Sequence, residues 1–214
     1  MEEFSIQTIV NGRYLIRKPL QTGSELLIAG FHGYGQTAED ELALLASIPG
    51  SETCTLCSIE ALHPFYTPKG DPGACWMTSR QRETRIEENV RYVEAVIERV
   101  LYSGIKLVFH GFSQGTGMAC RAALSGKHRA SGVMLLGGDI PPELELRDRM
   151  GKVHIARGSR DPIYREENFK KDCSRLHDAG VDHVSCTFSG GHEAASEYLE
   201  SAGVFIETIF QSCS

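Results

Sequence analysis

Two kinds of hydrophobic pattern alternate along the chain. Short apolar runs, typical of strands buried on both faces of a sheet, occur at 26–29, 53–59, 107–109, 132–136, 153–156 and 184–188. Between them, segments with apolar positions at helical spacing begin near Thr37, Ile86, Gly117, Glu167 and Tyr198. Strands that alternate with helices through short loops predict a mostly parallel central sheet with helices on both faces. No repeat or linker interrupts the pattern, so we expect a single domain over residues 1–214.

The N-terminal residues carry a different signal. Two apolar runs, 6–10 and 14–16, flank Asn11-Gly12. Asn-Gly between apolar runs is a strong short-range signal for a β-hairpin. We therefore expect an N-terminal antiparallel hairpin within residues 4–19.

Residues 61–80 predict a long irregular loop. They hold five prolines and glycines, together with Phe65, Tyr66 and Trp76. Structureless loops of that length in a compact domain are usually functional. We expect the three aromatic residues to form a wall for the acyl or alcohol part of a substrate, with Trp76 as a plain core residue the competing interpretation.

Composition narrows the classes of protein that fit. The 214 residues are 41% hydrophobic and carry a net charge of −6, and no Lys/Arg cluster stands free of acidic residues. Nothing therefore favours nucleic acid or an anionic membrane surface as a partner. The first residues lack the basic-then-apolar pattern of a signal peptide, and no run approaches the roughly 18 apolar residues that a membrane helix needs. We expect a soluble, cytoplasmic protein with no membrane span.

The seven cysteines indicate thiols rather than a disulfide framework, because the count is odd and the residues are scattered. Cys54 and Cys57 form a lone C-x-x-C in a predicted strand. Residues three apart in a strand face opposite sides of the sheet, and no second pair completes a zinc site. We interpret the two as core or surface thiols and expect no metal and no cofactor.

Candidate chemistry begins where the run at 107–109 leads into Gly111-Phe112-Ser113-Gln114-Gly115. G-x-S-x-G between a strand and a helix is the pattern of a nucleophile elbow. Such a turn forces the serine into a backbone conformation that side chains normally avoid, and it brings the flanking glycines too close to carry a Cβ. We predict that Ser113 is a nucleophile and that the N–H of Gln114, free at the helix start, meets a developing oxyanion. An incidental serine in a glycine-bearing turn is the alternative.

A serine nucleophile needs a base, and the base needs an acidic partner. His192 is the best base among the histidines, because it follows a late strand in a Gly-Gly turn, whereas His110 lies inside a strand and is expected to be packed. Asp161 and Asp139 both follow strands at the expected edge of the sheet. We favour Asp161, whose turn contains Gly158 and Pro162, and read Asp139 as a cap for the next segment.

The second oxyanion donor is expected in the loop after the first buried strand, which reads F-H-G-Y-G at 31–35. The backbone N–H of Tyr34 is our choice. Only twelve residues separate Asp139 from Lys152, too few for an inserted cap domain, so we expect an open site.

In its motifs the sequence resembles the phospholipase/carboxylesterase family, which includes acyl-protein thioesterases. The matching pieces are F-H-G-Y-G (31–35), G-F-S-Q-G (111–115), a G-x-x-D turn (158–161) and G-G-H-E (190–193). The resemblance implies an α/β-hydrolase fold without a large cap, a catalytic triad of Ser113, Asp161 and His192, and an oxyanion hole from the amides of Tyr34 and Gln114. It also implies a cofactor-free enzyme, often dimeric.

Two positions depart from the family pattern. Family members commonly have Trp-Phe-Asp in the long loop, whereas Trp76 is followed here by Met77-Thr78, and Thr116 stands where a second glycine is usual. These departures leave the triad motifs intact, and they bear instead on whether a lipidated-protein substrate carries over.

The resulting interpretation is a serine hydrolase that cleaves small carboxylic esters or thioesters through an acyl-serine intermediate. Two alternatives stay open. One is a hydrolase of another acyl bond, such as a peptide, lactone or lysophospholipid, because the triad chemistry is shared. The other is a non-catalytic binding protein on the same fold, which would normally lack a triad member.

Overall fold

The computed structural model describes residues 2, 4–19, 25–77 and 79–211. Its strands are β1 (Tyr14–Arg17), β2 (Leu26–Phe31), β3 (Thr55–Ile59), β4 (His63–Tyr66), β5 (Pro72–Cys75), β6 (Lys106–Phe112), β7 (Gly132–Leu136), β8 (Lys152–Gly158) and β9 (His183–Phe188). Its α-helices are α1 (Ala38–Ser47), α2 (Arg82–Val100), α3 (Gln114–Ser125), α4 (Glu166–Asp178) and α5 (Ser196–Gln211). Two 3-10 turns, η1 (Ser51–Thr53) and η2 (Asp148–Met150), complete the described elements.

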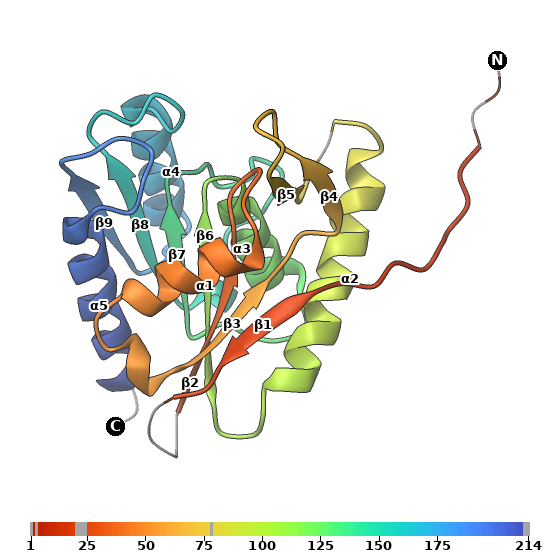
Figure 1. Cartoon of the computed structure of the whole chain (residues 1–214). Helices are drawn as coiled ribbons and strands as arrows, with labels where there is room; N and C mark the ends of the chain where they lie inside the picture. Colours follow the sequence, from red (N-terminus) through yellow and green to blue (C-terminus); the bar gives the residue numbers. More distant parts are fainter. Residues whose placement is uncertain (1, 3, 20–24, 78, 212–214) are drawn as a thin grey trace.

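In the described residues, seven strands form one sheet in the order β1-β3-β2-β6-β7-β8-β9 (Figure 1). All neighbouring strands are parallel except β1, which runs antiparallel to β3. The predicted mostly parallel sheet is therefore confirmed. Since β2, β6, β8 and β9 are parallel, the loops that follow them all leave the sheet at one edge.

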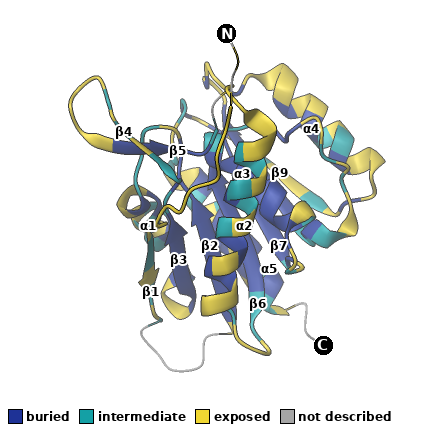
Figure 2. Ribbon diagram, turned by 90° about the vertical axis from the view of Figure 1, so that its right-hand side faces the viewer, coloured by how far each residue is buried: buried dark blue, intermediate teal, exposed yellow. Residues whose placement is uncertain are grey.

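Two apolar cores cover the two faces of the sheet. α2, α3 and α4 contribute to one core, and α1 and α5 contribute to the other. The strand residues alternate between these cores, as the two-residue period of a strand requires: Leu27 and Ala29 belong to the first, Leu26 and Ile28 to the second. Figure 2 shows the central strands buried and the exposed residues gathered on the helices and loops. Cys57 and Cys54 also lie in opposite cores, both as buried thiols.

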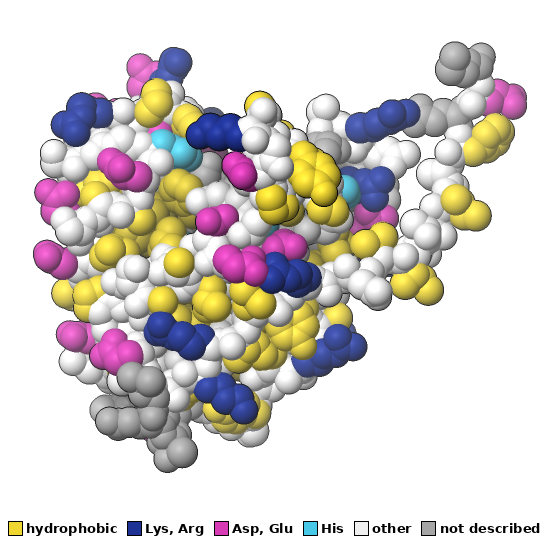
Figure 3. Space-filling model, viewed as in Figure 1, with side chains coloured by type: hydrophobic (Ala, Val, Ile, Leu, Met, Phe, Trp, Pro, Cys, Tyr) yellow, Lys and Arg dark blue, Asp and Glu magenta, His cyan; other side chains and the backbone are white. Residues whose placement is uncertain are grey.

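The N-terminal antiparallel pair of strands is present, but it is not the expected hairpin within residues 4–19. Residues 4–13 contain no strand, and β1 pairs instead with β3, with Tyr14 opposite Ile59. Figures 1 and 3 show the N-terminal segment leaving the body of the protein, with hydrophobic side chains standing clear of it; Ile6 and Ile9 are 91% and 96% exposed. A tight Asn-Gly turn needs a positive φ, which Gly12 does not have. Gly12 instead lies so close to Tyr92 that a Cβ would come within 2.0 Å of its ring.

The segment 61–80 is more ordered than the sequence suggests. β4 and β5 form a two-stranded antiparallel sheet, in which His63 lies opposite Cys75. Pro64 and Pro72 are tolerated because both strands of a two-stranded sheet are edge strands. The backbone of Ala74 pairs with the loop after β2, accepting from the Gly35 N–H and donating to the Gln36 carbonyl, each at 3.0 Å. This small sheet therefore supports the loop that carries Tyr34.

Two further features match the expected overall design. Residues 137–151, between β7 and β8, hold only the turn η2 and no inserted cap domain. Within the described residues, no helix has both the length and the apolar character needed to cross a membrane.

Candidate active site

Ser113 lies at the tip of the turn between β6 and α3. Its backbone has φ 53° and ψ −116°, a region that side chains rarely adopt. The two glycines of the motif make the turn possible: a Cβ on Gly111 would lie 2.4 Å from the Gly115 carbonyl oxygen, and a Cβ on Gly115 would lie 1.9 Å from that of Phe31. Both positions therefore exclude every larger residue. Thr116, the unusual residue of the motif, donates its hydroxyl hydrogen to the Ser113 carbonyl (2.7 Å) and ties the turn to the helix.

The structure brings Ser113, His192 and Asp161 into one hydrogen-bonded chain. His192 Nε2 is 2.8 Å from Ser113 Oγ, and His192 Nδ1 is 2.8 Å from Asp161 Oδ2. A carboxylate only accepts, so Nδ1 carries the proton and Nε2 is the acceptor that faces the serine hydroxyl. His192 Nε2 can therefore accept the hydroxyl proton of Ser113 when Ser113 Oγ attacks an electrophile.

Asp161 is fixed by its own turn. Its Oδ1 accepts the backbone N–H groups of Ile163 (2.8 Å) and Tyr164 (2.9 Å), which leaves Oδ2 for the histidine. Its side chain is 1% exposed, whereas that of His192 is 18% exposed. The acid is therefore shielded from water while the imidazole remains accessible to a substrate.

The loops that carry Asp161 and His192 are joined to each other. The N–H groups of Ser159 and Arg160 donate to the carbonyls of Phe188 (2.8 Å) and Gly190 (2.9 Å). A Cβ on Gly158 would lie 2.1 Å from the Gly191 carbonyl oxygen. Gly158 thus permits the close approach of the two loops, which sets the distance between the two side chains.

Asp139, the rival acid, lies outside this chain of hydrogen bonds. It is at the rim of the hollow beside Ser113, and no hydrogen bond links it to His192. Loss of solvent and then the negative charge of Asp172 raise the pKa of Asp139, although a hydrogen bond with Asn168 opposes the rise.

The other candidate bases are engaged elsewhere. His110 is fully buried, as the sequence predicts, and its ring nitrogens contact Glu41 Oε1 (2.5 Å) and the Tyr198 hydroxyl (2.8 Å). His177 and His183 lie at the end of α4 and the start of β9; the first is exposed and the second is half-exposed.

The backbone N–H groups of Tyr34 and Gln114 have no hydrogen-bond acceptor among the described residues. The Tyr34 loop is adjacent to the serine, because a Cβ on Gly33 would lie 3.3 Å from Ser113 Cβ. The loop is held by the Gly33 N–H, which donates to Gln36 Oε1 at 2.8 Å. The Gln114 side chain accepts the Trp76 N–H at 2.8 Å, which ties the start of α3 to the residue after β5.

The prediction that Trp76 forms part of an aromatic wall for the substrate is wrong. This residue is fully buried, its Nε1–H donates to the His32 carbonyl at 2.9 Å, and its ring packs edge-on against Phe31. It belongs to the core because the β4–β5 sheet folds it inward. Met77 follows it at the rim of the site, and Thr78 lies outside the described residues.

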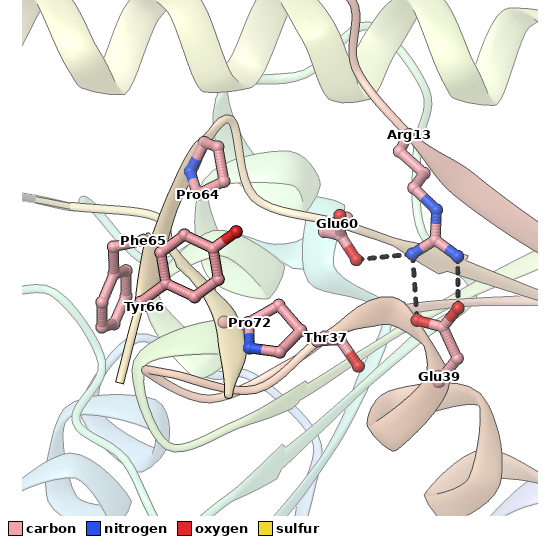
Figure 4. Close-up of a pocket in the computed structure, with 9 residues that line it drawn as sticks. Arg13, Thr37, Glu39, Glu60, Pro64, Phe65, Tyr66 and Pro72 are labelled. Carbon is pink, nitrogen blue, oxygen red and sulfur yellow. Dashed lines mark hydrogen bonds and ion pairs between the residues drawn. The ribbon is translucent and has the colours of Figure 1, made fainter. Parts of the chain in front are cut away.

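Phe65 and Tyr66 do not line the hollow that contains Ser113. They line a different one of about 740 Å³, which Figure 4 shows between the β4 side chains and Arg13. Arg13 is held there by Glu60 (2.7 Å) and Glu39. Phe65 also packs against Tyr34, with 5.0 Å between ring centroids. Its position therefore fits support of the Tyr34 loop better than contact with a substrate at Ser113.

The hollow beside Ser113 has a volume of about 350 Å³. Residues that sequence reasoning missed line much of it, namely Met77, Arg82, Arg121, Ile163 and Tyr164. One of them had a signal in the sequence: Arg121 is the one charged residue in the 115–123 stretch of α3, where every other residue is small or apolar except Thr116. The others come from loops and helix ends whose position only the fold determines.

The described residues contain one group that could hold a metal ion, Glu94, Glu98 and His128. Glu98 Oε1 is bound by Lys127 Nζ at 2.6 Å, and none of the three residues lines the hollow at Ser113. The group therefore has no contact with the candidate chemistry.

Residues 14–210 match the phospholipase/carboxylesterase family. The chain belongs to this family. An acyl-protein thioesterase 1 from Gibberella zeae is 29% identical over 133 residues, which are 56% of this chain and 57% of that protein. The match thus spans little more than half the length of that relative.

Solved structures of the family share the fold. The carboxylesterase of Bacillus cereus superposes with a TM-score of 0.74 at 18% identity, over 93% of this chain and 95% of the other. Zea mays acyl-protein thioesterase 2 gives 0.75 at 18%, over 93% and 99%. Esterase PE8 gives 0.76 at 21%, over 94% and 100%. This family member therefore has the α/β-hydrolase fold, and its family is one of esterase and thioesterase hydrolases.

Proposed function

We propose that this family member is a serine hydrolase that cleaves carboxylic esters or thioesters through an acyl-serine intermediate. The observation that carries the proposal is the chain of two 2.8 Å contacts that joins Ser113 Oγ to His192 and His192 to Asp161. A free serine hydroxyl is a weak nucleophile at neutral pH, and such a base next to it is the general remedy.

In the first half of the reaction, Ser113 Oγ attacks the carbonyl carbon while His192 Nε2 takes the hydroxyl proton. Asp161 holds the imidazole in the tautomer with Nδ1–H and stabilises the imidazolium that forms. The carbonyl oxygen, now negative, accepts hydrogen bonds from the N–H groups of Tyr34 and Gln114. The imidazolium then gives its proton to the leaving alcohol or thiol, and the acyl group stays on Ser113.

In the second half, water replaces the leaving group. His192 Nε2 removes a proton from the water as its oxygen attacks the acyl-serine carbonyl, and the same two N–H groups stabilise the new oxyanion. Collapse returns the proton to Ser113 Oγ and releases the carboxylic acid. Each oxyanion donor is expected to lower the barrier by about 3 kcal/mol.

The class of substrate follows from the family and from the open site. The similar proteins include a carboxylesterase and acyl-protein thioesterases, which supports ester or thioester bonds as the target. The absence of an inserted cap among residues 137–151 supports access for small substrates. A cytoplasmic location and a homodimer stay predictions from the sequence and the family resemblance.

A panel of short p-nitrophenyl esters and acyl thioesters tests the proposal. We expect the wild-type protein to hydrolyse them and Ser113→Ala to lose about a million-fold in kcat. Ser103→Ala, at an exposed serine in a loop, is the matched control and should retain full activity. Undiminished hydrolysis by correctly folded Ser113→Ala protein would refute the assignment.

A further inference from the structure

The hollow beside Ser113 contains a buried arginine. Arg121 lies on α3, two turns after Ser113, and its side chain is 4% exposed. Its Nη2 donates to Glu143 Oε1 at 2.5 Å, whereas its buried Nε has no hydrogen-bond partner. Buried guanidinium groups normally satisfy their donors, so an incompletely paired one in a wall of the hollow points to a missing acceptor.

The guanidinium group lies beside Gly117. Helical side chains lean toward the helix N-terminus, and that of Arg121 reaches back over Gly117, one turn closer to Ser113. A Cβ on Gly117 would lie 2.9 Å from Arg121 Nη1, so the glycine gives the charged group its room. Nη1 makes no hydrogen bond with the described residues, and both Gly117 and Arg121 line the hollow. A rise of about 1.5 Å per residue puts Gly117 roughly 6 Å along the helix axis from Ser113.

A second arginine converges on the same place. Arg82, at the start of α2, donates to the same Glu143 oxygen at 3.0 Å, and its side chain is 45% exposed. Two guanidinium groups thus share one oxygen of one carboxylate. Glu143 itself does not line the hollow; the acidic residue that does is Asp139, whose carboxylate is engaged with Asn168.

We propose that this hollow binds a carboxylate on the substrate, with Arg121 and Arg82 as its partners. The inference rests on the proposed function, because it assigns the substrate class of the same site. The substrate is then a hemiester or hemithioester of a short dicarboxylic acid, whose reacting carbonyl lies at Ser113 and whose free acid lies near Gly117. A separation of roughly 6 Å matches a spacer of about three or four methylene groups. A guanidinium group suits this task because its planar fork of donors matches carboxylate geometry.

Glu143 has a defined part in this arrangement. It comes from the loop after β7, and its side chain is 37% exposed. In the free protein the Glu143 carboxylate accepts hydrogen bonds from both guanidinium groups and so holds them together. Removing this internal competitor should therefore favour an anionic substrate, whereas removing an arginine should disfavour it.

Two esters that differ only in charge test the proposal. One is the p-nitrophenyl hemiester of glutaric acid, and the other is the same ester with its free acid capped as a methyl ester. The measured quantity is the ratio of kcat/KM for the acid to kcat/KM for the capped ester. We expect the wild-type ratio to exceed about 10, Arg121→Gln to lower it about ten-fold, and Glu143→Gln to keep or raise it.

Arg82→Gln provides a second variant that leaves the core intact, and it should lower the ratio several-fold. Thermal unfolding of each variant separates folding defects from lost recognition. A wild-type ratio near 1, an unchanged ratio in both arginine variants, or an equal loss in Glu143→Gln and Arg121→Gln would overturn the proposal. The last result would mean that the three side chains only clamp α2, α3 and the β7 loop together.

A binding experiment does not depend on turnover. We expect monomethyl glutarate to bind Ser113→Ala protein in a calorimetric titration, and binding to be lost when Arg121→Gln is added. Binding without hydrolysis of either ester by the wild-type protein would leave the carboxylate site standing and refute the serine hydrolase assignment. Equal hydrolysis of both esters without binding would do the reverse.

Discussion

Gly115 and Phe31 approach each other so closely that a methyl group on Gly115 would lie 1.9 Å from the Phe31 carbonyl oxygen. The first turn of α3 is thereby pressed against the end of β2, and the Gln114 N–H comes next to the loop that holds Tyr34. The spacing of the two proposed oxyanion donors therefore requires glycine at position 115, because no residue with a Cβ fits there.

Gly115→Ala should consequently damage both stability and activity. The added methyl group must push α3 away from β2, because its neighbours are backbone atoms that cannot rotate away. We expect a loss of about 1–3 kcal/mol in the free energy of unfolding, measured by urea titration, and a fall in kcat. Gly191→Ala is the control for stability, since the nearest atom to its Cβ would lie 4.0 Å away. Equal stability of both variants would contradict the steric argument.

Replacing Asp161 by Asn should leave the geometry intact and remove the function of the acid. The amide can donate to Nδ1 and favour the wrong imidazole tautomer, which puts a proton on the nitrogen that faces Ser113. We expect kcat to fall about ten-thousand-fold, by analogy with the effect of this exchange in other serine triads. The comparison variant Asp139→Asn should lose far less. A larger loss in Asp139→Asn would mean that the acid has been wrongly assigned.

Trp76→Ala should lower stability without changing substrate preference, because Trp76 is a core residue. The substitution empties a large buried volume and leaves the His32 carbonyl without its 2.9 Å donor. We expect the free energy of unfolding to fall by about 3–5 kcal/mol. The relative rates on a series of acyl chain lengths should stay the same in protein that remains folded. A shifted chain-length profile at unchanged stability would restore the aromatic wall.

His154 predicts how stability depends on pH. Burial, and then the positive charge of His110, lower the pKa of His154 from 6.5 to about 4. Since the folded-state pKa lies below the unfolded value, the unfolded chain takes up the proton first as the pH falls. The stability linked to this group is therefore complete above about pH 6.5 and is lost as the pH falls toward 4.

The expected loss from this one group is about 2 kcal/mol between pH 7.5 and 5.0. Burial also lowers the pKa of His32, which adds a loss in the same direction. Urea unfolding of His154→Gln at both pH values isolates the contribution, because glutamine does not titrate and can keep the 2.8 Å contact with Ser201. An acid sensitivity equal to that of the wild-type protein would show that His154 is not responsible.

The parallel sheet was predictable because each buried strand carries its own signal. β2 and β7 are continuous apolar runs and β6 contains one at 107–109, which is typical of strands covered on both faces. The hairpin predicted within residues 4–19 is not formed, because Asn-Gly is only a local signal and the position of this segment depends on a distant residue. Gly12 serves the close approach of Tyr92, whose hydroxyl donates to the Arg13 carbonyl at 2.6 Å. No pattern within residues 4–19 announces that contact.

The candidate site divides in the same way. Ser113, Asp161 and His192 could be proposed from glycine-rich turns, because the close packing of these loops requires glycine at positions such as Gly111, Gly115 and Gly158. The walls of the site could not be proposed so easily. The prediction that Trp76 and Phe65 line the site rests on residue type alone. In the fold, Trp76 lies in the core and Phe65 lines a different hollow. Arg121 and Arg82 meet only because α2 and α3 pack side by side.

Mass spectrometry of the protein after reaction with a fluorophosphonate probe tests the central claim most directly. The account predicts one adduct per chain, carried by the peptide that contains Ser113, lost in Ser113→Ala and formed far more slowly in His192→Gln. Ester hydrolysis that continues with no adduct, or an adduct on any residue other than Ser113, would contradict it.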